Sequence, residues 1–397
     1  MPEHPAVWRN DALLQLGASD VRFGDVSLTE LAATRGTPLY VYHSDRILEN
    51  ISALRDALGR IGRPFRIRYA MKCNRYVPVL DLIRAEGDIG IDACSPREVE
   101  LALSRGFTAG EITVTASNLA NADLRLLAQH GIHLNSDTCS VARRFGALGA
   151  GGSFGLRLDP PRPLQRDSGE KLNYIGGKFG VSRADLPAVY AAACAAGLNV
   201  NTLHVHCGWS MQSQHAVAFD AAMGALADTF AELPGIRTLN VGGGLAHRHR
   251  IDDQPMSIDT WSQIISRRLG HLPVTIECEI GTYIMANAGL LLTAVNTAER
   301  RSGQDWLGVD VGHAVNVYAY HYGIPLELVP VSRPHDAASR VYHVGSNINE
   351  AEDLLAREAA LPETREGDLL ALYCTGAYGA AMQSDHCLRG AAPEHLI

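Results

Sequence analysis

Lys72 is the first residue of this chain whose type and position could do chemistry. It ends a strand-like run that begins at Arg66, and Cys73 and Asn74 follow it. An aldehyde cofactor needs a lysine amine that can form a Schiff base, held on a rigid element close to phosphate donors. A lysine at the C-terminal end of a strand meets this need, although a solvated surface charge is the commoner reason for such a residue. Other features of the chain must decide between the two.

Further residues with chemical potential lie at or near the ends of other strand-like segments. They are Asp92, His206, Gly242, Gly243, Gly244 and Glu279. Consecutive glycines let a backbone approach a phosphate closely, because no Cβ obstructs the N–H groups. Glu279 stands in an apolar strand, where a carboxylate without a partner is costly, so it is either half of a structural ion pair or the acceptor of a ligand N–H. His206 shares a strand face with His204, and each is either a core histidine or, for His206, a residue that stacks on a ring.

The elements that position these residues follow from alternating strand and helix patterns. Strand patterns occur at residues 66–72, 88–94, 112–117, 133–137, 153–159, 202–208, 238–244 and 274–281. Helical patterns lie between them at 76–86, 96–105, 121–130, 184–197 and 261–269, and another, at 45–58, precedes the first strand. Ser95, Pro96 and Glu98 predict a helix start with an N-cap, a first-turn proline and a capping-box glutamate. Eight strands with helical crossovers over this length predict a (β/α)8 TIM-like barrel.

In such a barrel the active site lies at the C-terminal ends of the strands, which is where the candidate residues fall. Together they fit pyridoxal 5′-phosphate. Glu279 would accept the pyridine N–H and keep the ring cationic, which makes the ring a strong electron sink. The following residues, Ile280, Gly281 and Thr282, lie at the end of the last strand, where barrels often bind phosphate, and we expect them to complete the phosphate site with residues 242–244.

A second domain is expected from the change of pattern after residue 286. Strand patterns with little helix between them occur at 290–295, 306–311, 339–344 and 368–373, and two more occur near the start, at 21–23 and 39–42. We therefore expect residues 43–285 to form the barrel, and residues 1–42 with 286–397 to form a mostly β domain.

Composition excludes several classes of function. Hydrophobic residues are 46% and charged residues 20% of the chain, as in ordinary globular enzymes, and the net charge of -8 gives no electrostatic footprint for nucleic acid. No apolar run reaches membrane-spanning length, and the N-terminus lacks the pattern of a secretion signal. Eight cysteines without paired spacing favour reduced thiols and a cytoplasmic location, and no CxxC or HExxH pattern predicts a metal site.

The motif Tyr-Ala-Met-Lys-Cys-Asn at residues 69–74 resembles the lysine motif of fold-type III pyridoxal-phosphate decarboxylases, the family of diaminopimelate, ornithine and arginine decarboxylases. Stretches similar to the family follow in family order at 36–42, 92–95 with Glu98, 178–180, 204–206, 242–244 and 376–382. The resemblance covers about residues 36–397. It implies an alanine racemase-like barrel with a β domain, and pyridoxal 5′-phosphate as the cofactor.

The resemblance also implies roles for particular residues. Lys72 is expected to form the Schiff base, Glu279 to contact the pyridine nitrogen and His206 to stack on the ring, so these three are the catalytic candidates. Residues 242–244 and Tyr378 are expected to bind the phosphate. Sites of this family form at the interface of a homodimer, each completed by the partner's C-terminal domain, so a homodimer with an amino-acid substrate is expected.

The substrate side departs from the family pattern. The family's Glu-Pro-Gly-Arg motif ends here in Thr282, so a cationic contact is missing. The family's cysteine, which delivers a proton to Cα, falls on Ile348, and the acidic residue after it falls on Asn349; a shift of one position would offer Glu350 instead. The residues that we expect to contact the substrate are Trp209, Asn316, Tyr318, Tyr322, Asn349, Glu350 and His386.

The leading interpretation is a biosynthetic decarboxylase that removes the α-carboxylate of an amino acid or amino-acid conjugate, and that does not act on diaminopimelate. One alternative is an amino-acid racemase or epimerase. Glu279 argues against it, because racemases that resemble this fold use an arginine at the ring nitrogen. The other alternative is a non-catalytic protein that carries the cofactor, although such proteins lack a C-terminal β domain.

Overall fold

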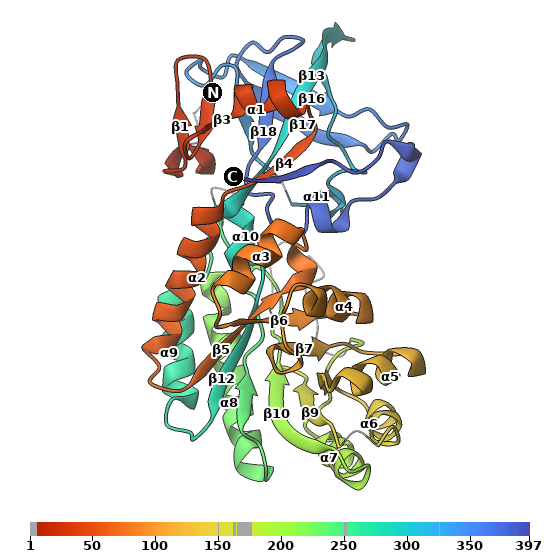
Figure 1. Cartoon of the computed structure of the whole chain (residues 1–397). Coiled ribbons are helices and arrows are strands. Elements are labelled where there is room, and N and C mark those ends of the chain that lie inside the picture. Colours follow the sequence, from red (N-terminus) through yellow and green to blue (C-terminus); the bar gives the residue numbers. More distant parts are fainter. Residues whose placement is uncertain (1–5, 150, 162–163, 165–176, 250–251, 325) are drawn as a thin grey trace. The chain divides into compact units, whose positions relative to one another are not determined.

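The structure is a computed structural model of the 397-residue chain, and it describes residues 6–149, 151–161, 164, 177–249, 252–324 and 326–397 (Figure 1). Contacts divide the chain into two compact units. One comprises Met1–Leu48, His247–Asp253 and Ile284–Ile397, and is called the β unit below. The other comprises Glu49–Ala246 and Gln254–Tyr283, and is called the barrel unit. We retain 43–285, and 1–42 with 286–397, as the proposed domain boundaries.

Eight parallel strands close the barrel. They are β5 (Phe65–Ala70), β6 (Ile89–Ala93), β7 (Ile112–Thr115), β8 (His133–Ser136), β9 (Ser153–Leu158), β10 (Asn199–Val205), β11 (Thr238–Asn240) and β12 (Thr275–Ile280). Each strand pairs with the next along the chain, and β12 pairs with β5 to complete the ring. The predicted (β/α)8 barrel is therefore confirmed, with all eight strands close to their expected positions.

Helices follow the strands on the outside of the barrel (Figure 1). Among the described residues they include α3 (Val77–Ala85), α4 (Pro96–Ser104), α5 (Asn121–His130), α6 (Cys139–Gly146), α7 (Leu186–Ala195), α8 (Ala216–Glu232) and α9 (Ile258–Leu269), while α2 (Ser44–Gly59) precedes β5. The sequence patterns did not give ranges for α6 or α8, although the expected (β/α)8 order includes helical crossovers between its strands. Alanines around most of α8 blur the apolar period that marks an amphipathic helix, which explains why it was missed.

The start of α4 fixes the end of β6. Ser95 caps the helix by accepting from the Glu98 backbone N–H, as the sequence predicts. The Glu98 carboxylate, however, accepts from the N–H of Cys94 at 2.6 Å, one residue before the N-cap. These hydrogen bonds join the end of β6 to the start of α4, and so they restrain the turn that carries Cys94.

Polar side chains fill part of the barrel interior. Arg68 on β5 donates to Glu277 on β12 at 2.9 Å, and the Asn240 amide on β11 donates to Glu277 at 3.0 Å and to Glu279 at 2.9 Å. All four side chains are buried, between 0% and 6% exposed. Buried charges are tolerated when they are paired and hydrogen-bonded, so this network depends on the register of the closed barrel.

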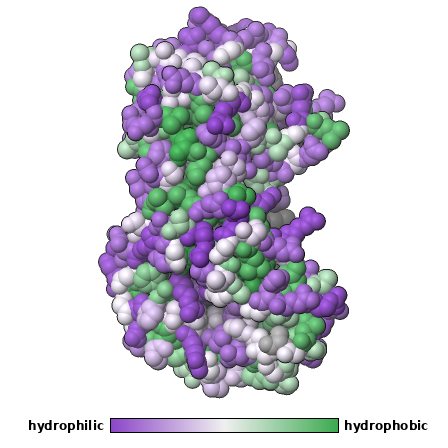
Figure 2. All heavy atoms as spheres, viewed as in Figure 1, coloured by the Kyte–Doolittle hydropathy of each residue, from purple (hydrophilic) through white to green (hydrophobic). Residues whose placement is uncertain are grey.

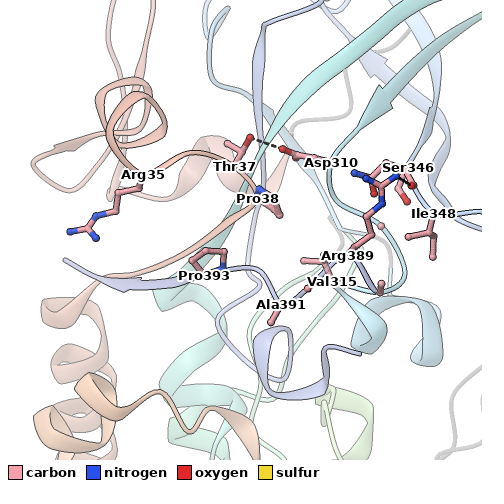
Figure 3. A pocket seen from close by; sticks show the side chains of 14 residues that line it. Arg35, Thr37, Pro38, Asp310, Val315, Ser346, Ile348, Arg389, Ala391 and Pro393 are labelled. Atoms are coloured by element: carbon pink, nitrogen blue, oxygen red, sulfur yellow. Dashed lines mark hydrogen bonds between the residues drawn. The ribbon is translucent and has the colours of Figure 1, made fainter. Parts of the chain in front are cut away.

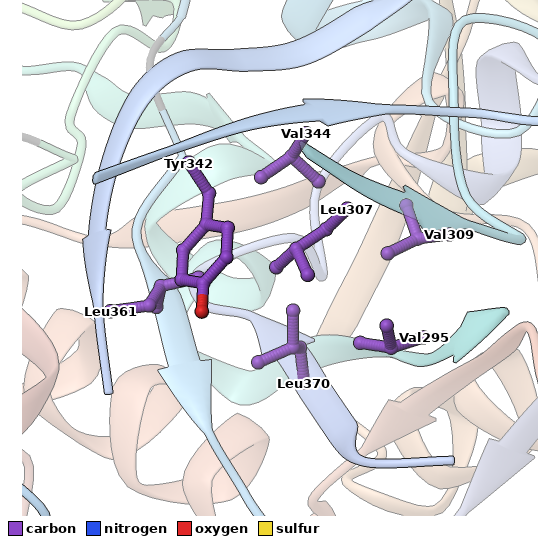
Figure 4. Packing of buried hydrophobic residues seen from close by; sticks show 7 residues of the cluster. All are labelled: Val295, Leu307, Val309, Tyr342, Val344, Leu361 and Leu370. Atoms are coloured by element: carbon purple, nitrogen blue, oxygen red, sulfur yellow. The ribbon is translucent and has the colours of Figure 1, made fainter. Parts of the chain in front are cut away.

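The β unit is built on a sheet of mostly antiparallel strands. Its order is β15 (Leu328–Pro330), β18 (Leu369–Leu372), β13 (Gly289–Arg301), β14 (Gln304–Val309), β16 (Arg340–Gly345) and β17 (Leu354–Leu361), with β4 (Leu39–Tyr42) on β13 and β19 (Glu394–Leu396) on β4. A smaller sheet holds β1 (Leu14–Leu16), β2 (Val21–Phe23) and β3 (Val26–Ser27). The core beneath β13 to β18 contains Val295, Leu307, Val309, Tyr342, Val344, Leu361 and Leu370 (Figure 4). The prediction of a mostly β C-terminal part is confirmed.

Strand β17 was not predicted, because its residues Leu-Leu-Ala-Arg-Glu-Ala-Ala-Leu favour a helix when taken in isolation. Pairing with β16 overrides that local preference.

Hydrophilic residues cover much of the face drawn in Figure 2. Within the described ranges, no helix is both long and apolar enough to cross a membrane.

Candidate active site

Lys72 lies in the short 3-10 turn Met71–Cys73 that directly follows β5. Its Nζ donates to Asp92 Oδ2 at 3.1 Å and lies 3.5 Å from Cys94 Sγ. The Lys72 side chain is 41% exposed, whereas that of Asp92 is fully buried. The chain contains three lysines, and the other described one, Lys178, lies over the ring of Phe179 at 4.8 Å. Lys72 is thus an accessible amine at a strand end, beside an acid that could take its proton.

Asp92 combines complete burial with neighbours of both signs. Burial raises the pKa of its carboxyl to about 7, the charge of Glu279 adds to this shift, and Lys72 opposes it. Among the described residues, none donates a hydrogen bond to its buried Oδ1 atom. A carboxyl that titrates near neutral pH beside an amine can exchange a proton with it. The carboxyl can therefore hold the proton that Lys72 must lose to act as a nucleophile.

Cys94 is a residue near Lys72 that sequence reasoning passed over. Burial raises the pKa of its thiol to about 12, so the thiol remains protonated at neutral pH. Two positions separate it from Asp92 at the end of β6, and a strand places such positions on one face. That spacing was the signal that could have found it.

Glu279 near the end of β12 is 6% exposed and accepts three hydrogen bonds. Thr115 of β7 and Asn240 of β11 each donate to Oε1 at 2.9 Å, and His204 Nε2 of β10 lies 3.0 Å from Oε2. Burial alone would raise the pKa of this carboxyl, but His204 and Lys72 outweigh it and hold the pKa below its usual range. Glu279 is therefore an ionised carboxylate inside the barrel. Its three donors were not foreseen, because they come from three separate strands.

His206 follows β10 and contacts the glycine run. Its Nδ1 accepts from the Gly243 N–H at 3.2 Å. Burial and then the charge of Arg157 lower the pKa of His206 to about 3, so its imidazole is neutral. A neutral imidazole presents a flat, uncharged face, which suits stacking on an aromatic ring.

The glycine run after β11 could carry no larger residue. A Cβ at Gly242, where φ is +68°, would lie 2.4 Å from a backbone oxygen of β10, and a Cβ at Gly243 would lie 2.2 Å from the backbone carbonyl oxygen of Glu279. The backbone therefore passes close to both strands, as a phosphate-binding loop must. Gly281, just beyond β12, would likewise bring a Cβ to 2.8 Å from Cys73 Cβ, next to Lys72. Thr282 then begins the short helix α10 (Thr282–Met285).

These residues fit pyridoxal 5′-phosphate. The barrel unit brings together an accessible lysine, a buried carboxyl with an unpartnered oxygen, an ionised carboxylate, a neutral histidine and a glycine run that leaves no room for a Cβ. The lysine amine can bind the aldehyde, the ionised carboxylate can pair with a cationic ring nitrogen, and the backbone of the glycine run can bind the phosphate.

The other expected site residues lie mostly in the β unit. Tyr378 stacks on Tyr318, with 5.1 Å between ring centroids, and Tyr322 lies 5.4 Å from Tyr318. Asn316 is buried to 1% exposure just before helix α11 (Val317–Tyr322). Trp209 belongs to the barrel unit, three residues after His206. Their roles toward phosphate or substrate stay predictions.

Two of the cavities that the described residues line lie within the β unit. One, of about 360 Å³, is lined by Ile348 and Ser346, and Arg389 reaches across it to donate to the Asn347 carbonyl at 2.6 Å (Figure 3). The other, of about 570 Å³, is lined by His313, Val317, Tyr320, His321, Glu350, Glu352, Asp353, Ser384 and His386. His386 and Glu350 are 2.8 Å apart there, so the structure brings two of the expected substrate residues together. Asn349 is exposed next to them.

Comparisons with known proteins agree with this chemistry. A family model described as pyridoxal-dependent decarboxylase, pyridoxal binding domain, matches residues 44–286. Diaminopimelate decarboxylase of Methanothermobacter thermautotrophicus is 32% identical over 94% of this chain and 90% of its own length, and that of Pseudomonas aeruginosa is 31% identical with the same coverage. The crystal structure of diaminopimelate decarboxylase from M. jannaschii in complex with L-lysine is similar in fold, with a TM-score of 0.88 and 20% identity over 97% of this chain and 93% of that one.

The shifted pKa of Asp92 predicts a pH dependence of stability in the cofactor-free protein. The pKa is about 7 in the folded chain and about 4 in an unfolded one, so between these values the folded state binds more protons. The free energy of unfolding should therefore fall as pH rises from 4 to 7. Asp92→Asn should remove part of that fall, and urea unfolding at pH 4.5 and 7.5 measures it. The exposed Asp228→Asn is the matched control and should keep the wild-type dependence. Identical pH dependence in Asp92→Asn and wild type would contradict the assignment.

Proposed function

The chain belongs to the pyridoxal-dependent decarboxylase family, and we propose that it removes the α-carboxylate of an amino acid or amino-acid conjugate other than diaminopimelate. It is a carboxy-lyase, and its cofactor is pyridoxal 5′-phosphate. The observation that carries the proposal is the ionised Glu279 with its three donors. When bound, the cofactor supplies the electron sink that takes up the electron pair left on Cα when CO2 departs.

The proposed roles of the barrel residues follow from their contacts. Lys72 holds the cofactor through its Nζ, and Asp92 takes up and returns the proton of that amine. Glu279 accepts a hydrogen bond from the ring N–H and so keeps that proton on the ring nitrogen, because its carboxylate is already ionised. His206 packs its neutral face on the ring. A carboxylate at the ring nitrogen favours decarboxylation over racemisation, since it keeps the sink strong.

Phosphate binding is assigned to backbone groups. The glycine-containing segments 242–244 and 280–282 lie at the ends of the neighbouring strands β11 and β12. The backbone packs so closely there that a Cβ at Gly242, Gly243 or Gly281 would collide with neighbouring atoms. Backbone N–H groups that are free of Cβ obstruction can surround an anion. Tyr378 stays a proposed phosphate contact from the β unit.

The substrate proposal rests on substitutions at positions that resemble the family's substrate contacts. Thr282 stands in place of an arginine, and Ile348 and Asn349 stand in place of a cysteine and an acid. A charged distal group that loses water on binding needs a charged or polar partner. Without those partners, a neutral, aromatic or bulky conjugated side chain is favoured.

Diaminopimelate is the second candidate substrate, for two reasons. The relatives that are 31–32% identical are named diaminopimelate decarboxylases. In addition, Glu350, Glu352 and Asp353 line one cavity of the β unit, and carboxylates of that kind can pair with a distal ammonium group. The choice between the two substrates is therefore open to a direct assay.

The assay measures CO2 release and loss of optical activity across a panel of amino acids that includes meso-diaminopimelate, ornithine, lysine and arginine. We expect CO2 from a substrate outside these four, and a kcat/KM below about 10⁴ M⁻¹s⁻¹ for each of the four, the lower edge of ordinary enzyme efficiency. Efficient turnover of meso-diaminopimelate would overturn the substrate proposal and leave the reaction class intact. Loss of optical activity without CO2 would establish a racemase, and neither signal would favour a binding protein.

Lys72 is expected to carry the cofactor. Borohydride should reduce the bond between Lys72 Nζ and the cofactor, abolish the visible absorbance band and leave a stable adduct that peptide mass spectrometry maps to Lys72. Lys72→Ala should lose the adduct, whereas Lys178→Ala serves as the control and should keep it. An adduct on Lys178 in the wild-type protein would remove Lys72 from the site.

The working form is proposed to be a two-fold homodimer. A closed two-fold dimer is the commonest assembly of soluble enzymes, and members of the family that this chain resembles build their sites from two subunits. Light scattering at the protein concentration of the assay should give twice the mass of the chain. An active monomer at that concentration would contradict this proposal.

A further inference from the structure

One oxygen of the Glu279 carboxylate can accept a further hydrogen bond. Oε1 already accepts from Thr115 and Asn240, and Oε2 accepts only from His204 among the described residues. A carboxylate oxygen accepts about two hydrogen bonds, so Oε1 is filled and Oε2 has one acceptor position left. A ring N–H that binds Glu279 must therefore share Oε2 with His204.

His204 is a buried donor to Glu279. It is fully buried, its Nε2 lies 3.0 Å from Glu279 Oε2, and none of the described residues bonds its Nδ1 atom. Because an oxygen of an ionised carboxylate can only accept a hydrogen bond, the proton between the two side chains belongs to Nε2, and His204 donates it to Oε2.

We propose that His204 is a positioning residue that acts through Glu279 Oε2 to keep the proton on the cofactor's ring nitrogen. The inference rests on the proposed function, in which Glu279 faces that nitrogen. A hydrogen bond to the carboxylate stabilises its ionised form and lowers its affinity for a proton. Without the His204 donor, a buried carboxylate binds a proton more tightly, so the proton passes from the ring nitrogen to Glu279 and the electron sink weakens.

The other titratable groups around Glu279 do not replace this contact. Lys72 and His206 act on it through space, as does Asp92 with the opposite sign. Among the described residues, the hydrogen bonds that the Glu279 carboxylate accepts come from Thr115, Asn240 and His204. The Asn240 amide donates to Glu277 as well as to Glu279, and Arg68 donates to Glu277 and balances its charge. His204 is thus the donor on the oxygen that the ring nitrogen needs.

The test measures the ring nitrogen directly. Holoenzyme is prepared with ¹⁵N-labelled pyridoxal 5′-phosphate, and the ¹⁵N chemical shift of the ring nitrogen distinguishes N–H from bare nitrogen across a pH series. His204→Leu removes the donor, His204→Gln places an amide N–H near the Nε2 position, and His204→Asn keeps a polar core group that is too short to reach Glu279. His133→Leu is the matched control, because His133 is a barrel histidine that bonds Ser153 and Asn135 and not Glu279.

We expect an N–H shift in wild type, His204→Gln and His133→Leu, and a shift toward bare nitrogen in His204→Leu and His204→Asn. The kcat of the last two should fall roughly 10- to 100-fold with little change in KM, the size expected for one hydrogen bond to a charged group. If His204→Leu fails to fold, the Gln and Asn variants carry the comparison by themselves.

Two outcomes separate the inference from the proposed function. If Glu279→Gln alters the ring shift and both His204→Leu and His204→Asn keep the wild-type shift and pH profile, His204 is structural and the inference fails. If Glu279→Gln also keeps the wild-type shift, Glu279 does not face the ring nitrogen, and the proposed site itself fails.

Discussion

The buried negative charge of Glu279 is the constraint on which the barrel's chemistry depends. A carboxylate at 6% exposure is tolerated only when donors replace the water it has lost. The donors come from β7, β10 and β11, so four strands must hold their relative heights before the charge is stabilised. An ionised Glu279 therefore requires the closed barrel in its observed register, because a strand shifted by one residue would point its donor away from the interior.

The surroundings drive the pKa values of two neighbouring carboxyls apart. Donors lower that of Glu279, while burial and the charge of Glu279 raise that of Asp92 to about 7. One group is thereby suited to holding a fixed charge and the other to exchanging a proton with Lys72. Such a separation is how one site carries both a fixed ion and an acid–base group at neutral pH.

Reaction class and substrate depend on different parts of the molecule. The groups that fit the cofactor stand at the ends of barrel strands, where packing restrains them. Most of the residues expected to meet the substrate lie in the β unit, and Asn349 and Glu350 lie in one of its exposed loops, where substitution disturbs packing least. A relative with the same cofactor site can therefore act on another amino acid, which is why the names of relatives fix the chemistry more firmly than the substrate.

The sequence by itself determined the architecture and the cofactor. Alternating strand and helix patterns located all eight barrel strands, and Lys72, His206, the glycine run and Glu279 could be named because each lies at or near the end of a strand in a motif that is local in the chain. Sequence patterns failed in two ways. The first failure concerns local preference: strand β17 has residues that favour a helix, and only pairing with β16 makes it a strand.

The partners of Glu279 were beyond the sequence for a different reason. Thr115, His204 and Asn240 are ordinary polar residues in ordinary strands, separated from Glu279 by 164, 75 and 39 positions. No local pattern marks them, because what unites them is that barrel closure brings four strands around one carboxylate. The tertiary structure alone decided which side chains set the charge of the site, since hydrogen bonds and pKa values depend on distances that only the closed barrel fixes.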